Sequence, residues 1–312
     1  MNIYDGGDDI NFIYIIDPAK YRVFLEKGIS KYLLKLLKTK YKARKIDQIS
    51  RGDYVIGHVC GLNLQKLNYE DQEDMEAYIS NIKDLIDDEY SYLYIEESLP
   101  LDIKRAIGDR LSIDLCEGRE IRLYNIPYII KALKSKWKDD IIKEEILIVS
   151  SDKDEVLKMI YSICDEFSFI SVLALNDEDG QDVYEKVLDD LGISIYYPNR
   201  VNVSLKRYGL IINLEDDVFI NLDQVKNKTI VIDFSERKPF SKVNRYVIED
   251  ISIDISDFDL DDNPWIGKEI CSDLSKAFSK GSYKEFNRIY KDNELLTIID
   301  FLNQSLKIKG GY

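Results

Sequence analysis

Short apolar stretches alternate with amphipathic stretches along most of this chain. Runs rich in β-branched and aromatic residues predict strands, whereas apolar residues three and four positions apart predict helices. In the first half, this pattern predicts strands at residues 10–17, 53–62, 90–97 and 110–116. It predicts helices at residues 21–41, 69–86, 99–108 and 124–137. Alternation at this spacing indicates a mostly parallel sheet that helices cover.

The alternation starts again after a polar segment at residues 136–145. The next predicted strands are residues 145–151, 168–176, 192–198, 208–216 and 228–236, and the predicted helices are 153–164 and 181–191. An acidic loop at 249–265 and helical segments at 267–279, 283–290 and 294–307 follow. Isoleucines alternate with the acids of the loop, so we expect the loop to pack on the protein surface.

We therefore predict an α/β protein of two domains with mostly parallel sheets. The N-terminal α/β domain spans residues 1–138, and a second α/β domain spans residues 139–250. Residues 251–312 contain the acidic loop and the C-terminal helices, which we expect to pack back on the domains and brace them.

The chain is strongly acidic, because 43 Lys and Arg residues stand against 58 Asp and Glu residues, a formal net charge of −15. Such a surface repels nucleic acid and anionic lipid, so we expect neither as a partner. The basic stretch at residues 31–45 has leucines at helical spacing, and we interpret it as the solvated face of a helix. The sequence has no secretory signal pattern and no apolar run of the roughly 20 residues that a membrane span needs. We expect a cytoplasmic protein.

The cysteines do not form a metal-binding pattern. Cys60, Cys116, Cys164 and Cys271 lie far apart, no C-x-x-C pair is present, and His58 is the only histidine. We expect no metal site, and we expect reduced thiols.

Three segments of the second domain resemble one family. They are the strand-turn-helix "ILIVSSDKDEVLKMI" at 146–160, "YGLIINLED" at 208–216, and "NKTIVIDFSERKP" at 227–239. Together they resemble the NAD(P)-binding Rossmann domain of the shikimate dehydrogenase and glutamyl-tRNA reductase group. The resemblance implies a Rossmann-like second domain, a separate α/β domain before it, C-terminal helices that return to the first domain, and NAD or NADP as cofactor.

The turn after the first strand departs from that family. The family has G-x-G-x-x-G or G-x-G-x-x-A there, because glycine lets the backbone approach the pyrophosphate. This chain has no glycine at residues 150–155. Serines would narrow the phosphate site, acids would oppose a diphosphate, and Asp152 is a good N-cap that can occupy the free N–H groups itself. We therefore interpret the turn as degenerate, with three outcomes open: a dinucleotide, a modified ligand, or loss of nucleotide binding.

Position in the fold selects the candidate cofactor-binding residues. Ser150 and Ser151 form the turn, Asp177 follows the second strand where a ribose-binding acid would lie, Asn213 ends the fourth strand, and Asp233 lies near the end of the fifth. The alternative for Asp177 is an acidic loop that starts a helix.

Two further candidates lie in the N-terminal domain. Histidine is the side chain whose unperturbed pKa lies near neutrality, and His58 stands between Gly57 and Gly61, near the carboxyl end of a predicted strand, so it is a candidate catalytic residue. We expect His58 and Asn63 to line the substrate cleft. The alternative for His58 is a histidine that is hydrogen-bonded in the core.

These features predict a dehydrogenase-like protein with a degenerate nucleotide-binding turn. It would bind a small metabolite or nucleotide in an interdomain cleft, and the sequence leaves hydride transfer open. The alternative is a non-enzymatic scaffold or regulatory protein with a closed cleft and a protein partner, which the 22 tyrosines favour because tyrosine is enriched at interfaces. A receiver domain is a weaker alternative, since the third predicted strand is not followed by an aspartate.

Overall fold

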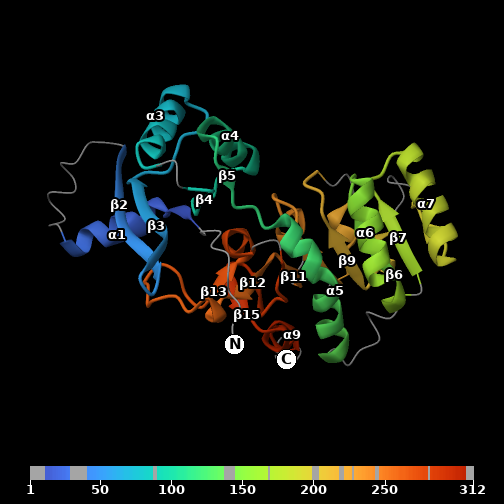
Figure 1. Ribbon diagram of the computed structural model, residues 1–312. Helices are drawn as coiled ribbons and strands as arrows, with labels where there is room; N and C mark the ends of the chain where they lie inside the picture. Colours follow the sequence, from blue (N-terminus) through green and yellow to red (C-terminus); the bar gives the residue numbers. More distant parts are fainter. Residues whose placement is uncertain are drawn as a thin grey trace. The chain divides into compact units, whose positions relative to one another are not determined.

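Two mainly parallel sheets organise the chain, one in each of two units (Figure 1). Unit 1 comprises residues 1–118 and 254–282, and unit 2 comprises residues 119–253 and 283–312. The predicted division placed its boundaries at residues 138 and 250 instead. The computed structural model describes residues 11–28, 41–86, 90–136, 145–167, 169–198, 204–217, 221–226, 228–242, 246–279 and 282–306.

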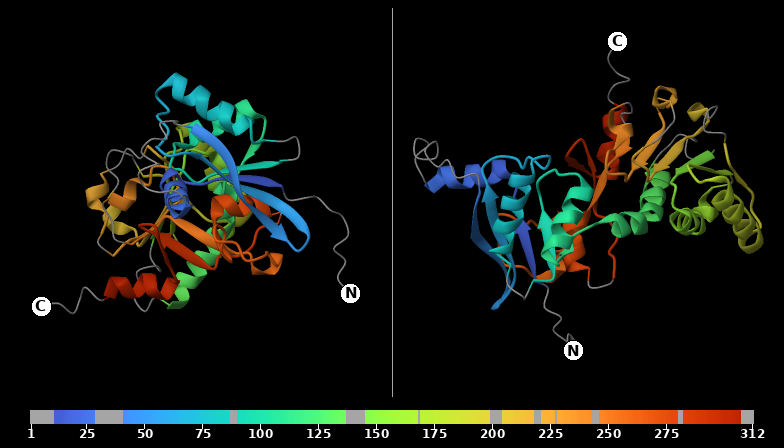
Figure 2. Two further views of the ribbon diagram at one scale, coloured as in Figure 1. Left: turned by 90° about the vertical axis from the view of Figure 1, so that its left-hand side faces the viewer. Right: turned by 90° about the horizontal axis from the view of Figure 1, so that it is seen from above.

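The sheet of unit 1 has the order β2-β3-β1-β4-β5. Its strands are β1 Phe12–Ile15, β2 Tyr41–Arg51, β3 Tyr54–Asn63, β4 Tyr92–Ile95 and β5 Asp114–Leu115. β3, β1, β4 and β5 run parallel, and β2 pairs antiparallel with β3. Figure 2 shows the long β2–β3 hairpin in blue from two further sides.

Strand β2 corrects one expectation. Residues 41–45 belong to this strand, so the solvated-helix interpretation of the basic stretch is wrong for them; residues 31–40 lie outside the described part of the chain. The leucines at helical spacing end at Leu37, and Gly52, at φ +57°, turns the chain back into β3. Pairing with β3 therefore decides the conformation of this segment.

Helices cover both faces of this sheet. α3 Gln72–Lys83 and α4 Leu101–Leu111 pack on one face, where Tyr78 and Ile82 meet Ile13 and Leu93. α1 Pro18–Gly28 and the segment of residues 255–278 pack on the other face. That segment includes β13 Glu269–Cys271 and α8 Ser272–Ser275. Both faces are therefore apolar, as a parallel sheet requires.

The sheet of unit 2 has the order β11-β10-β9-β6-β7-β8, and its strands run parallel. They are β6 Glu145–Val149, β7 Phe169–Leu173, β8 Ile195–Tyr196, β9 Leu210–Asn213, β10 Ile230–Asp233 and β11 Val247–Ile248. Counted within the unit, this is the order 3-2-1-4-5-6 of dinucleotide-binding Rossmann domains. The predicted Rossmann-like fold is confirmed. The receiver-domain alternative, which requires the order 2-1-3-4-5, is wrong.

Four helices cover one face of this sheet: α5 Arg119–Lys136, α6 Lys153–Ile163, α7 Asp177–Leu191 and α9 Ile298–Leu306. The short 3₁₀ turns Leu205–Arg207 and Pro239–Lys242 contribute Leu205 and Phe240 to the other face. The carboxyl edge of the sheet, where ligands of such folds bind, is built from the loops after β6, β7, β9 and β10.

The C-terminal region contains more strand than the sequence pattern predicted. β12 Asp250–Asp254, β14 Arg288–Lys291 and β15 Glu294–Leu296 pair antiparallel. The predicted helix at 283–290 is wrong, because Asp292 and Asn293 adopt positive φ and turn β14 into β15. Ile251 and Ile253 are buried, so the expectation that the acidic loop packs on the protein is confirmed. Within the described residues, no helix has both the length and the apolar character needed to cross a membrane.

Gly61 on β3 provides a test of this packing. A Cβ atom added there would lie 2.2 Å from the ring of Tyr21, which is buried. We expect Gly61→Ala to lower the free energy of unfolding by about 1–3 kcal/mol, because the ring must move. At Gly267 the nearest atom is 3.8 Å away, so Gly267→Ala is the matched control. Equal urea midpoints for the two variants would contradict the packing described.

Candidate functional site

The turn after β6 is held together by its own serine. Ser150 is fully buried, and its N–H donates to the carbonyl of Leu173 at 3.1 Å. Its Oγ accepts the N–H of Asp152 at 3.2 Å and lies 3.3 Å from Oε2 of Glu155. The hydroxyl therefore lies inside the turn and bonds to the chain itself.

Ser151 forms hydrogen bonds that distinguish this turn from a nucleotide-binding turn. Its N–H and its hydroxyl both donate to Oε1 of Glu215, at 2.5 and 2.6 Å. In nucleotide-binding turns, N–H groups at this position point at a phosphate. Here a carboxylate of the same chain occupies that position.

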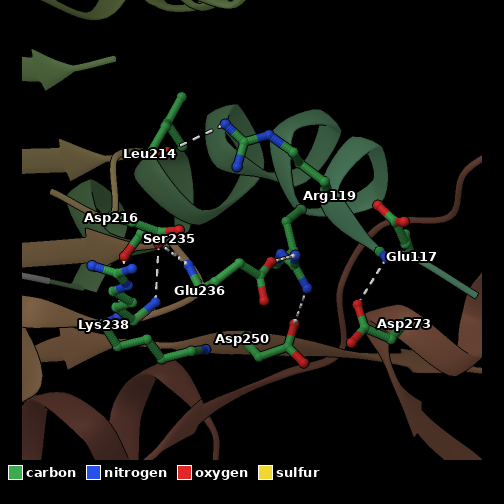
Figure 3. A network of polar contacts seen from close by, with 12 residues as sticks. Glu117, Arg119, Leu214, Asp216, Ser235, Glu236, Lys238, Asp250 and Asp273 are labelled. Atoms are coloured by element: carbon green, nitrogen blue, oxygen red, sulfur yellow. Dashed lines mark hydrogen bonds and ion pairs between the residues drawn. The ribbon is translucent and has the colours of Figure 1, made fainter. Parts of the chain in front are cut away.

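The start of helix α6 is also satisfied internally. Oδ1 of Asp152 accepts the N–H of Glu155 at 3.0 Å, which confirms the predicted N-cap. Arg119 binds both carboxylate oxygens of Glu155, at 2.6 and 2.8 Å. It also donates to the carbonyl of Leu214 at 3.2 Å (Figure 3). Arg119 thus neutralises the negative charge that Glu155 brings to the turn.

Asn213 and Asp233 tie the ends of β9 and β10 together. Both are fully buried, and Nδ2 of Asn213 donates to Asp233 at 2.8 Å and to the carbonyl of Glu215 at 2.9 Å. Asp233 also accepts the hydroxyl of Ser235 at 2.6 Å and the N–H of Phe240 at 3.1 Å. Burial raises the pKa of Asp233, although these hydrogen bonds oppose the shift. The pair therefore positions the loop that carries Glu215; its predicted contact with a cofactor stays a prediction.

The loop after β10 is held by the loop after β9. Oδ1 of Asp216 accepts the N–H groups of Glu236 and Arg237 at 2.7 and 3.0 Å, and the N–H of Lys238 donates to Oγ of Ser235 (Figure 3). The carboxyl edge is thus a connected polar network, as buried polar groups require.

A pocket of about 850 Å³ opens beside this network, at the carboxyl ends of β7 and β8. Its walls include Leu173, Leu175, Tyr184, Ile195 and Tyr197, and Asp177 lies at its rim as the first residue of α7. Asn176 caps this helix by accepting the N–H of Asp179 at 2.8 Å. Asp177 thus lies both in a helix-starting loop and at the position predicted for a ribose-binding acid.

His58 does not lie at a strand end. It stands in the middle of β3, opposite Ile13 of β1, well before Asn63 ends the strand. Its Nδ1 lies 2.6 Å from the hydroxyl of Tyr90, which in turn accepts from Lys45 Nζ at 3.0 Å. The structure places this group apart from the strand ends where ligands collect.

Asn63 lies instead beside a glutamate that sequence reasoning missed. Asn63 and Glu97 are 2% and 1% exposed, and Oε1 of Glu97 accepts the N–H of Leu67 at 2.8 Å. Among the described residues, neither Oε2 of Glu97 nor Oδ1 of Asn63 has a hydrogen-bond donor. Burial raises the pKa of Glu97 and the charge of Asp17 adds to the shift, whereas the hydrogen bonds from Leu67 and Asn63 and the charge of Lys66 oppose it. A proton on Oε2 of Glu97 would make this atom a donor for Oδ1 of Asn63.

Glu97→Gln tests this protonation. A group whose pKa is higher in the folded protein than in the unfolded chain stabilises the fold through its protonated form. This stabilisation is fully present below the ordinary Glu pKa of about 4.3 and is lost as the pH rises through the pKa of the folded protein. The amide introduced by this substitution would offer its donor at every pH. We therefore expect E97Q to gain stability over the wild type as the pH rises from 4 to 8, by about 1.4 kcal/mol in total for each unit of pKa shift.

The exposed Glu70 provides the control for that series. E70Q removes one acid from the same region, and its urea midpoints should follow the wild type at each pH. An E97Q profile parallel to the wild type from pH 4 to 8 would show that the pKa of Glu97 is not raised in the folded protein.

Comparisons with known proteins found similarity to solved structures only. No protein-family model and no curated protein matches the chain. A dipicolinate synthase chain from Bacillus halodurans is similar with a TM-score of 0.36 and 12% identity, over 74% of this chain and 84% of that chain. Shikimate dehydrogenase from Aquifex aeolicus is similar with a TM-score of 0.30 and 12% identity, over 75% and 82%.

A third similar structure is Δ1-pyrroline-2-carboxylate reductase from Thermococcus litoralis, in complex with NADH and L-proline. Its TM-score is 0.27 and its identity 9%, over 36% of each chain, so the match spans about a third of the reductase. The strand order of unit 2 alone confirms the Rossmann-type fold that the resemblance to the shikimate dehydrogenase group implied.

Proposed function

We propose that this protein is a dehydrogenase-like ligand-binding protein that does not use NAD or NADP for hydride transfer. Its Rossmann-type unit binds a small metabolite or a nucleotide-derived molecule at the carboxyl edge of the sheet. The observation that carries the proposal is the pair of hydrogen bonds from Ser151 to Glu215, because they occupy the donors on which a diphosphate would depend.

The charges at the turn support the same conclusion. A phosphate placed at these donors would meet the carboxylate of Glu215 and lie near Asp152. Two like charges 4 Å apart repel by about 4 kcal/mol in a partly shielded site. A helix N-terminus offers an anion only about 0.3–1 kcal/mol at an exposed site, and Asp152 already uses part of that. Repulsion exceeds attraction, so the residues present do not fit a diphosphate.

Away from the turn after β6, the carboxyl edge of the sheet in unit 2 still offers room for a ligand. The pocket beside β7 and β8 has the volume of a small-molecule site, apolar and aromatic walls, and one acid at its rim. A molecule without a diphosphate can enter it and leave the bond between Ser151 and Glu215 intact. This supports a binding protein built on a dehydrogenase-like fold.

Glu215→Ala tests the proposal by freeing the donors of Ser151. The wild type should show no thermal shift with NAD, NADP or inorganic pyrophosphate. The variant should gain an anion site, so that pyrophosphate at ten times its Kd adds about 1.4 kcal/mol to its stability. Differential scanning fluorimetry measures both.

Asp217→Ala is the matched control for that experiment. Asp217 is exposed, pairs with Arg237 at 2.6 Å, and follows Glu215 closely in the same loop. D217A removes the same charge and leaves the turn unchanged, so it should not respond to pyrophosphate. Micromolar binding of NAD by the wild type would overturn the proposal.

A further inference from the structure

Three tyrosines form a cluster of rings on helix α5 and the segment that precedes β14. The ring centroids of Tyr124 and Tyr128 lie 5.4 Å apart, and the ring of Tyr283 meets that of Tyr124 edge-on at 5.7 Å. Tyr124 is 40% exposed, so the cluster reaches the protein surface. Single exposed aromatic residues are common, whereas a contiguous group of them marks a surface that binds something.

The polar tips of these rings are bonded within the cluster. Glu120, Tyr124 and Tyr128 stand four residues apart and therefore share one face of α5. The hydroxyls of Tyr124 and Tyr128 lie 3.2 Å apart, and the hydroxyl of Tyr283 donates to Glu120. Rings that are already held in one orientation lose little conformational entropy when a partner binds.

A buried asparagine attaches the segment that carries Tyr283 to α5. Asn125 is fully buried, its Nδ2 donates to the carbonyl of Lys284 at 3.1 Å, and its Oδ1 accepts the N–H of Phe286 at 2.7 Å. These two bonds lie on either side of Glu285 in the chain. The core of unit 2 thus fixes the backbone of Glu285 beside the helix that bears Tyr124.

Glu285 gives the cluster a negative charge. It is exposed, and its carboxylate forms no hydrogen bond or ion pair with any residue that the structure describes. The hydrogen bond with Tyr128 raises the pKa of Tyr124, and the charge of Glu285 adds to the shift, so this carboxylate lies close to the rings. Electron-rich ring faces beside a carboxylate attract a cation.

The chemistry of the cluster selects arginine among the cations. A guanidinium is planar, lies flat on an aromatic ring and binds a carboxylate through two parallel hydrogen bonds, whereas the ammonium of lysine is a compact point charge. One cation–π contact at an exposed site improves affinity only about two- to fivefold, which is too little to hold a small cation alone. A protein segment can add further contacts, and tyrosine and arginine are the residues that dominate such interfaces.

We propose that Tyr124, Tyr128, Tyr283 and Glu285 form a docking surface for an arginine-containing segment of a protein partner. A guanidinium stacks on the tyrosine rings and pairs with Glu285. The net charge of −15 attracts such a basic segment at long range. The inference does not depend on the proposed function, because it uses neither the turn after β6 nor the pocket beside β7 and β8.

Two fluorescent peptides of equal charge test this surface, one with three arginines spaced by glycines and one with lysines at the same positions. Fluorescence anisotropy measures the Kd of each for the full chain. We expect the wild type to bind the arginine peptide about fivefold more tightly than the lysine peptide, because only the guanidinium stacks on the rings.

Leucine substitutions remove the aromatic faces and keep the apolar surface. The variant Y124L/Y128L should bind the two peptides equally, and Glu285→Gln should weaken the arginine peptide about two- to fivefold. Tyr161 of α6 is also exposed and donates to Asp190 at 2.5 Å, so Tyr161→Leu is the matched control and should keep the preference for arginine. The melting temperature of each variant reports that it is folded.

The outcomes support or overturn the docking surface as follows. A preference for arginine that Y124L/Y128L loses and Y161L keeps supports it. Equal binding of the two peptides by the wild type, or equal losses in the two tyrosine variants, would show general attraction to an acidic protein and overturn it. Micromolar binding of tetramethylammonium by the wild type, lost in Y124L/Y128L, would assign the rings to a small cation and would also overturn the proposal.

Discussion

The contact between Ser151 and Glu215 decides what unit 2 can hold. A Rossmann-type turn binds a diphosphate because its backbone N–H groups have no partner within the protein. In this chain the same group is bonded to a carboxylate at 2.5 Å. The anion is thus part of the protein, and a ligand that brings its own anion must displace it. On this ground we propose that the Rossmann-type fold is retained without its usual diphosphate site.

That contact depends on polar groups deeper in the protein. Asn213 bonds to the backbone of Glu215 and to Asp233, and both side chains are fully enclosed. Removing either one would leave the other buried without its partner, which costs about 1–3 kcal/mol. On the other side, Arg119 compensates Glu155 and holds the carbonyl of Leu214. Glu215 is therefore held from both sides of its loop, and its position is fixed by the core of the sheet.

The sequence predicts those parts of the structure that depend on residues close together in the chain. The strand-turn-helix at β6, the cap at Asp152 and the order of buried strands follow from periodicity and capping chemistry. The absence of glycine distinguished the turn after β6 from the family pattern. The sequence gives no local signal for contacts whose partner lies far away in the chain. Glu215 is an acid after a strand like several others, and Arg119, the first residue of α5, belongs to no special motif.

The wrong predictions also concern segments whose partners lie far away in the sequence. Residues 41–45 carry basic side chains that suit a helix surface, yet pairing with β3 makes them a strand. Residues 288–291 pair with β12 and β15, which no short-range pattern indicates. The sequence predicts His58 near the carboxyl end of a strand, between two glycines, but Gly57 and Gly61 are the positions where Phe12 and Tyr21 pack against β3. Tertiary packing decided each of these positions.

The amide resonance of Ser151 tests the central claim most directly. A short hydrogen bond to a carboxylate shifts an amide proton strongly downfield, and the bond should persist in the presence of a nucleotide. We predict that the ¹⁵N–¹H signal of Ser151 in the wild-type protein stays at this downfield position through a titration with millimolar NAD. A saturable shift of that signal as NAD is added would show that the diphosphate displaces Glu215 and would contradict the account.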